Sequence, residues 1–379
     1  MSTPVAQPVS LIQAQPAFAS VVSVAAPKEL TAVSPEMWGV VSQMQSITIR
    51  QHTKLLPKAC CTCPPCAPQE NTYSVYAGLT KDSEAEFIRV DEVSDDWNRC
   101  CCKPYHPLRL EARQYIPMPG EGGNSDWAHL KSDTMRDWNG LNATRRVQAM
   151  KDVYRQQPVL FSMVRNDGMR CCFKCPCKCL STFVCFQCCQ DGMTLYPGAL
   201  ADEPGKEAGR HVKPDPSTAL GSAIQPNFGG WCTPTIHLRG EGQGEDATPF
   251  GKIEGPCFFG GWSEMCCDFK FFVSKFDSDK KTGDQALITK KKPGSLAAAF
   301  VELASDADVY TIVYNEQAGL TASQKLTIMM GQLLADYMFF DGNTEKCSQD
   351  DNAVYCYCCY FSCIGALCPV YIAIPKNKG

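Results

Sequence analysis

The side chains best suited to chemistry are the cysteines of a dense mid-chain cluster: Cys171, Cys172, Cys175, Cys177, Cys179, Cys185, Cys188 and Cys189. Cys172 with Cys175 and Cys185 with Cys188 form two C-x2-C pairs, which supply four thiolates for a tetrahedral zinc site. The spacer between the pairs is shorter than in a zinc ribbon. Thiols beside Phe173 and Lys174 also suit thioester-linked acyl chains, several of which anchor a protein stably to a membrane. The cluster therefore predicts acylation or zinc binding, with simple packing of small side chains as a third interpretation.

Cysteine content and charge restrict the compartment and the class of protein. The chain has 379 residues and 25 cysteines, an odd number, and neighbouring cysteines cannot readily pair with each other. The N-terminus lacks the charged-then-apolar pattern of a secretory signal, so a reducing cytosolic setting is expected rather than a disulfide scaffold. A formal net charge of -4 argues against a general nucleic-acid binder.

Enzyme motifs are missing from the sequence. It contains no Walker loop, no dinucleotide fingerprint and no G-x-S-x-G, and none of the five histidines has a cysteine or serine partner at motif spacing. An enzyme that works by covalent or nucleotide chemistry is therefore not expected.

One apolar helix is predicted from Thr321 to Asp341, with Thr321 as the N-cap and Gln324 completing a capping box. Apolar side chains cover all of its sides, which indicates that it is buried. Its apolar part is shorter than the roughly 20 residues that span a bilayer, and it contains Asp336, so a helix inside a protein core is favoured. The residues expected to fill that core include Leu326, Met330, Leu333, Leu334, Tyr337 and Phe340.

Short β-type runs separated by turn residues precede this helix. They are residues 46–51, 72–76, 87–90, 108–110, 159–163, 194–196, 222–224, 235–238, 250–253, 269–274, 286–289 and 309–314. These runs and the single helix predict a mainly β fold in which a sheet wraps around the helix. Lys290, Lys291 and Lys292, just before Pro293-Gly294, are predicted to be solvated in a turn.

Composition divides the rest of the chain. Residues 1–44 are predicted to be a flexible low-complexity leader, and 117–157 and 201–221 are insertions in the β region. Residues 342–379 form a cysteine-rich apolar extension, in which 352–375 carry no charge and are long enough to cross a bilayer. If this segment crossed a bilayer once, the lysines that follow it would lie in the cytosol and the thiol-rich body would lie outside. That arrangement contradicts the reducing setting expected from the cysteines. An acylated, interfacial or protein-packed segment is therefore favoured over a span.

The order of several segments resembles the phospholipid scramblase family. They are SITIRQHTKLL, NRCCCKPYHPLRL, the mid-chain cysteine cluster, GKIEGPC, CCDFKFFVSK, DADVYTIVY and QLLADYMFFD. The similarity covers roughly residues 46–341 and is clearest from GKIEGPC to MFFD. The resemblance implies that residues 45–341 form a closed twelve-stranded antiparallel β-barrel around the C-terminal helix. It also implies that the mid-chain cysteines, Cys171 to Cys189, carry covalent palmitate.

The activity implied by the resemblance is calcium-stimulated, ATP-independent movement of phospholipids in both directions between membrane leaflets, or the regulation of that movement. Part of the family's calcium segment can be carried over, because Asp306 and Asp308 occupy its first two acidic positions. Gln317 stands where the closing acid would be, and Glu316 lies one residue earlier. Calcium takes six to eight oxygen ligands, so the loss of a carboxylate predicts a weak site.

A second hypothesis is a non-catalytic structural or scaffolding subunit of a larger assembly, built on the same barrel and able to bind zinc. The insertions, the C-terminal extension and Gln317 depart from the family pattern and favour it. The expected partners are membrane phospholipids, together with proteins bound through the insertions and the extension; nucleic acid is not expected. The expected location is the cytosolic face of the plasma membrane or an organelle membrane.

Overall fold

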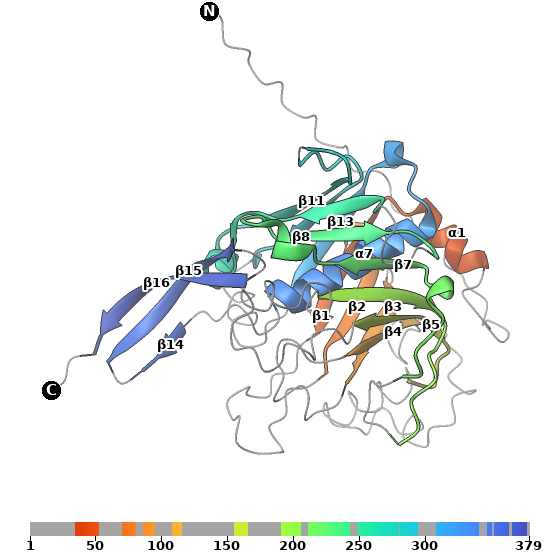
Figure 1. The fold of residues 1–379 in the computed structure, drawn as a ribbon, viewed down its shortest axis with the longest axis horizontal. Coiled ribbons are helices and arrows are strands. Elements are labelled where there is room, and N and C mark those ends of the chain that lie inside the picture. Colours follow the sequence, from red (N-terminus) through yellow and green to blue (C-terminus); the bar gives the residue numbers. More distant parts are fainter. Residues whose placement is uncertain are drawn as a thin grey trace, which may run out of the picture.

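A closed antiparallel β-barrel forms the body of the protein (Figure 1). The computed structural model describes residues 35–52, 70–80, 86–94, 108–115, 155–165, 191–205, 211–242, 249–279, 281–294, 308–340, 347–350, 352–363 and 366–376. The barrel strands are β1 (Ser46–His52), β2 (Thr72–Ala77), β3 (Glu86–Val93), β4 (Arg109–Gln114), β5 (Val159–Arg165), β6 (Gly192–Pro197), β7 (Gly221–Ile224), β8 (Thr235–Arg239), β9 (Gly251–Glu254), β11 (Phe269–Lys275), β12 (Ala286–Lys290) and β13 (Val309–Tyr314). Each predicted run overlaps one of these strands, and the predicted barrel is confirmed.

The strands follow each other around the barrel in chain order, except that β9 pairs directly with β11. The barrel closes where β1 pairs with β13, with Ser46 opposite Val313 and Arg50 opposite Val309. Alternate side chains of a strand point to opposite faces, so one apolar set from every strand lines the interior. Ile47 and Ile49 of β1 are examples, and both are buried.

The helix α7 (Ala322–Phe339) occupies the interior. In Figure 1 it lies between β1 to β5 on one side and β8, β11 and β13 on the other. All of its residues except Ala322 and Gln324 are buried. The predicted capping box is present: Gln324 donates its backbone N–H to Thr321 Oγ1 at 3.2 Å, and Gln324 Oε1 accepts from the Thr321 N–H at 2.9 Å. The central position predicted for this helix is therefore confirmed.

Small residues allow α7 to approach the wall closely at β7. A Cβ atom added to Gly221 would lie 2.0 Å from Thr327 Oγ1 on the helix and 3.0 Å from the backbone oxygen of Arg239. A Cβ on Gly331 would lie 2.7 Å from Ile253 Cδ1. The helix and the wall are thus in contact on this side, with no room for an added methyl group.

The prediction of a flexible leader up to residue 44 is wrong for its last part. Residues Pro35–Gln43 form the helix α1. Val41 is buried, and Met37 and Trp38 pack against the barrel core. Lys325 of α7 donates through Nζ to the backbone oxygens of Ser42 (2.6 Å) and Met44 (2.7 Å). These contacts with distant residues stabilise a helix that its own composition did not indicate.

A second sheet contains the C-terminal extension. Its order is β10 (Phe258–Phe259), β15 (Ala353–Cys363) and β14 (Cys347–Gln349), with β16 (Ala366–Pro375) paired along β15. Figure 1 shows this sheet projecting from the side of the barrel. The uncharged run 352–375 is therefore a β-hairpin. No helix in the described part of the chain has both the length and the apolar character needed to cross a membrane.

Short 3-10 helices connect several strands: η6 (Pro216–Thr218), η7 (Asn227–Gly230), η8 (Gly261–Met265) and η9 (Glu316–Ala318). The predicted insertion 201–221 holds η6 and a bridge between Asp202 and His211, and its last residue begins β7. Of the predicted insertion 117–157, only its last three residues are among those described.

Candidate functional site

A buried polar cluster surrounds the C-terminal half of α7. Asp336 is fully buried and accepts hydrogen bonds from the hydroxyl of Tyr73 on β2 (2.9 Å) and that of Tyr310 on β13 (2.5 Å). Because β2 and β13 are the two neighbours of β1, the carboxylate attaches the helix to the wall on both sides of the closing seam. A buried charge is tolerated only when such donors surround it.

Lys290 supplies the cation of this cluster. It points inward because it shares a strand face with Ala286 and Ile288 of β12. Its Nζ atom lies 2.9 Å from Asp308 Oδ2 and 3.4 Å from Glu264 Oε2. Burial alone would lower the pKa of Lys290, but the carboxylates of Asp308 and Glu264 outweigh it and raise that pKa above its usual value. The ammonium therefore stays charged.

Tyr310 stays neutral for related reasons. Its burial and the negative charges of Asp308 and Asp336 raise its pKa well above the ordinary tyrosine value. Its single O–H proton is therefore retained and is shared between Asp336 at 2.5 Å and Asp308 at 3.1 Å. The cluster has no exposed acid or base to exchange with water; its effect is to fix the position of α7.

Aromatic rings complete the cluster at the C-terminal end of α7. The Phe340 ring centre lies 3.8 Å from Lys290 Nζ, a cation–π contact. Phe340 also packs against Phe271 of β11 and against Phe259 of β10, whose ring centres are 6.1 and 5.5 Å away. Since β10 belongs to the second sheet, this contact joins the barrel interior to the extension.

A second polar branch lies one residue further along α7. The Tyr337 hydroxyl donates to Glu92 Oε2 at 2.9 Å. The Arg165 guanidinium lies 6.0 Å from the Tyr337 ring and forms two bonds with the carboxylate of Asp191, at 2.8 and 2.5 Å. Such bidentate pairs are strong and geometrically specific. They add buried charged residues at the C-terminal end of the helix.

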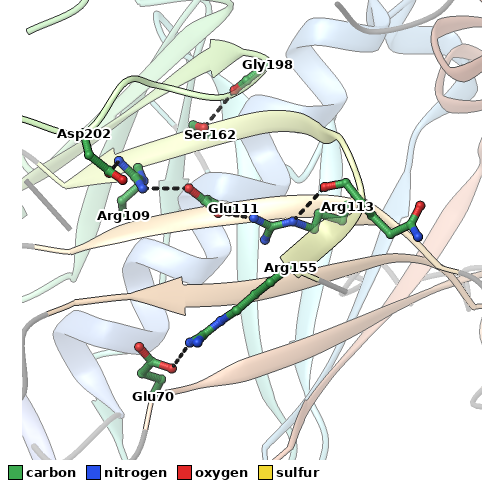
Figure 2. Close-up of polar contacts among 9 residues, drawn as sticks. Glu70, Arg109, Glu111, Arg113, Arg155, Ser162, Gly198 and Asp202 are labelled. Atoms are coloured by element: carbon green, nitrogen blue, oxygen red, sulfur yellow. Dashed lines mark hydrogen bonds and ion pairs between the residues drawn. The ribbon is translucent and has the colours of Figure 1, made fainter. Parts of the chain in front are cut away.

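The outer face of β4 carries another buried set of charges, which Figure 2 shows along one strand. Arg109 pairs with Glu111 Oε1 and with Asp202 Oδ1, each at 2.8 Å. Arg113 donates to Glu111 and, through Nε, to the backbone oxygen of Gln157 at 3.2 Å. The ion pair to Asp202 attaches the 201–221 insertion to β4.

The predicted calcium residues are not brought together where the structure describes them. Asp308 precedes β13 and Glu316 follows it, so the length of the strand separates them, roughly 20 Å at about 3.3 Å per residue. The Asp308 carboxylate is buried against Lys290, and Glu316 is exposed in η9. Asp306 lies outside the described residues. Among the residues that are described, no three carboxylate, thiol or imidazole groups lie close enough to hold a metal ion.

The mid-chain cysteines, both as palmitoylation sites and as the zinc set Cys172, Cys175, Cys185 and Cys188, lie outside the described residues. Every cysteine in the described ranges is a free thiol. Five of these thiols, Cys356, Cys358, Cys359, Cys363 and Cys368, lie on the hairpin of β15 and β16. Burial raises the pKa of Cys356, as does its hydrogen bond with Cys347 directly across the sheet.

Two parts of the cluster were not predicted. Lys290 was expected to be solvated with its neighbours, but it is the last inward residue of β12, and only Lys291 and Lys292 are exposed. Glu264 had no sequence signal, since it lies in the irregular η8 turn. The alternation of Ala286, Ile288 and Lys290 does indicate that the lysine faces the core.

Comparisons of the chain with protein-family models, with curated proteins and with solved structures give no match.

Proposed function

We propose that this protein acts on membrane phospholipids in the manner of a phospholipid scramblase, moving them between leaflets or regulating that movement. One observation carries the proposal: a closed antiparallel barrel encloses the apolar helix α7. This is the architecture implied by the sequence resemblance over residues 46–341. The order of the segments and the fold both support this proposal.

The filled interior restricts the route by which phospholipids could move. Larger barrels can enclose a ligand cavity or a channel, but here α7 packs against the wall on the β7 side and is held by Asp336 on the β1 side. On this proposal phospholipids move along the outside of the barrel or in the bilayer beside it. The protein would then act by perturbing the bilayer rather than by conducting lipid through its core.

The proposal includes stimulation by calcium, but only through a weak calcium site. Asp308 is held by Lys290 at 2.9 Å, so a calcium ion would have to compete with a buried ammonium for this carboxylate. Gln317, in place of an acid, offers an uncharged ligand. We therefore expect a calcium requirement in the millimolar range, where weak sites of few carboxylates lie.

The test is exchange of fluorescent phospholipid across vesicles reconstituted with the full chain, with and without calcium. We expect exchange above protein-free vesicles and stimulation by calcium. Asp308→Asn should lower the stimulated rate, and Glu316→Gln at the exposed residue tests whether Glu316 adds a calcium ligand. No exchange under either condition would overturn the transport proposal and favour the structural-subunit alternative, which predicts stoichiometric protein partners that stay bound after hydroxylamine removes acyl groups.

A further inference from the structure

The extension hairpin has two chemically different faces. Tyr357 and Tyr371 lie opposite each other on β15 and β16, with ring centres 5.9 Å apart, and Tyr355 contacts the Tyr371 ring edge-to-face on the same side. The residues between them point the other way: Cys356 lies opposite Ile372, and beyond it Val354 lies opposite Ile374. One face is therefore tyrosine-rich, and the other, named here the aliphatic face, carries Val354, Cys356, Phe361, Val370, Ile372 and Ile374.

The aliphatic face is turned away from the barrel. At the inner end of the hairpin, Tyr360 pairs with Phe259, and both are buried, with Phe259 packed on Phe339 and Phe340 of α7. The neighbouring pair, Phe258 with Phe361, faces the opposite side. Phe258 is 58% exposed, and Val370, Ile372 and Ile374 are 40%, 60% and 53% exposed. The apolar surface therefore continues from β10 across to β16.

Between its two ends, the sequence of the hairpin contains no charged side chain. Residues 352–375 include no acid, lysine, arginine or histidine; Asp350 and Lys376 lie at the outer end of the hairpin, where Lys376 Nζ donates to the Asp350 backbone oxygen. Protein–protein interfaces usually have a polar rim that fixes orientation. A bilayer boundary needs no such rim, because it accepts an apolar surface in any rotation about the membrane normal.

The edge of β16 argues against extending the sheet into a second copy. The Lys376 N–H bonds to Asn352 at 2.8 Å, so even-numbered residues direct their amides toward β15 and odd-numbered residues direct theirs outward. Pro369 and Pro375 occupy outward positions and have no N–H, which leaves Leu367, Tyr371 and Ala373 as outward donors. Those three amides would also be unsatisfied in hydrocarbon, so the sheet can lie on a bilayer but cannot cross it.

We infer that the aliphatic face of the extension sheet docks on the surface of a lipid bilayer, with the tyrosine face toward the protein and water. The inference rests on the proposed membrane role, but it concerns attachment and not lipid movement. Because the surface is uncharged, docking is insensitive to ionic strength and does not require anionic lipid. It also places the hairpin thiols beside the bilayer, within reach of acylation.

The test is flotation of the full chain, produced without acylation, with phosphatidylcholine vesicles at low and at high salt. We expect binding that is unchanged by salt. Ile372→Gln with Ile374→Gln should lower the partition coefficient by roughly 10- to 100-fold, since two large apolar side chains are removed from the contact. Tyr371→Gln with Ala373→Gln, on the opposite face of the same strand, should keep it within about twofold, because the transferred apolar area is unchanged.

Equal loss in both variants, or none in either, overturns the inference. Light scattering tests the alternative of a second copy. If the wild-type chain is a dimer that only the Ile372 and Ile374 variant dissociates, and no vesicle binding is seen, the face binds a second copy and the inference is also overturned. Hydrogen exchange on the unmodified chain does not depend on folding of a variant: residues 366–376 should gain protection on vesicles, and no gain contradicts docking. Lipid exchange can fail while this binding persists, so the two proposals are tested separately.

Discussion

Lys290 Nζ lies 2.9 Å from Asp308 Oδ2 and, on its other side, faces the Phe340 ring. The Lys290 ammonium, on the wall strand β12, thus contacts both the residue just before β13 and the residue that follows α7. Glu264 of η8 adds a third element at 3.4 Å. The barrel, its helix and the turn beside the extension sheet therefore share one buried charge.

Replacement of this lysine should be costly. Lys290→Met leaves Asp308 and Glu264 buried without their cation, and loss of one partner of a buried pair lowers the free energy of unfolding by about 3–5 kcal/mol. Lys291→Met is the control, because Lys291 is half-exposed and its pair with Asp268 at 3.4 Å should contribute under about 1 kcal/mol. Urea denaturation of both variants measures the difference, and equal stabilities would contradict the assigned pairing.

The two tyrosine donors of Asp336 should be coupled. Tyr73→Phe and Tyr310→Phe each remove a hydrogen bond to a buried carboxylate, at about 1.5–3 kcal/mol. The double variant should lose more than the sum, since the carboxylate then lacks both hydroxyls. Tyr355→Phe removes a hydroxyl bond to the exposed Asp350 and should change stability by under about 0.5 kcal/mol. Strict additivity in a double-mutant cycle would argue against a shared acceptor.

Close contact between α7 and β7 predicts a size limit at Gly221. Gly221→Ala places a methyl group against Thr327 Oγ1 and the Arg239 backbone oxygen, and such overpacking costs about 1–3 kcal/mol. Thr327→Ala in the same chain removes the nearest atom and should restore part of the loss. Gly39→Ala in α1, with nothing within 4 Å, should instead stabilise the protein by up to about 1 kcal/mol. Thermal unfolding distinguishes these outcomes; Gly221→Ala without loss would contradict the close approach.

Acid should destabilise the barrel partly through His52. Burial and the nearby Arg89 and Arg50 lower the pKa of His52 to about 3. A lowered pKa means that the unfolded chain binds the proton first, so stability is complete above about pH 6.5 and falls as the pH drops toward 3. His52→Gln should make the slope between pH 6 and 4 shallower by about 1 kcal/mol per pH unit. An unchanged slope in urea titrations across this range would contradict a neutral, partly buried imidazole.

A smaller effect of the same sign is expected at His237. Burial, followed by Arg239 and Lys252, lowers its pKa to about 4, a smaller lowering than the one at His52. His237→Gln should therefore change the acid slope less than His52→Gln does.

The barrel strands and α7 could be predicted because their signals are local. Tyr310, Ile312 and Tyr314 alternate along β13, and Thr321 with Gln324 marks the helix start whatever surrounds it. The extension hairpin had the same kind of signal, since tyrosines at 355 and 357 alternate with cysteines at 356 and 358. The absence of charge instead favoured an acylated, interfacial or protein-packed segment over a span, and the period of two did not enter that prediction.

The polar cluster could not be predicted in this way, because its members meet only through register. Lys290 faces Tyr310 across β12 and β13, while Glu264 and Asp336 arrive from elements far apart in the chain. The helix α1 has the same origin: Lys325, far along the chain, donates to the carbonyl oxygens at its end. Residues whose partners are distant have no local signal of burial.

The seam between β1 and β13 also sets the order of folding. Residues 46–50 pair with 309–313, so the ring cannot close until nearly all of its strands have been synthesised. The helix that fills it is made later still, after η9. A ring of inward apolar side chains with nothing at its centre is not a stable intermediate. Closure of the seam and entry of α7 must therefore be one late cooperative event, and a chain that stops before residue 322 would remain unfolded rather than form a hollow barrel.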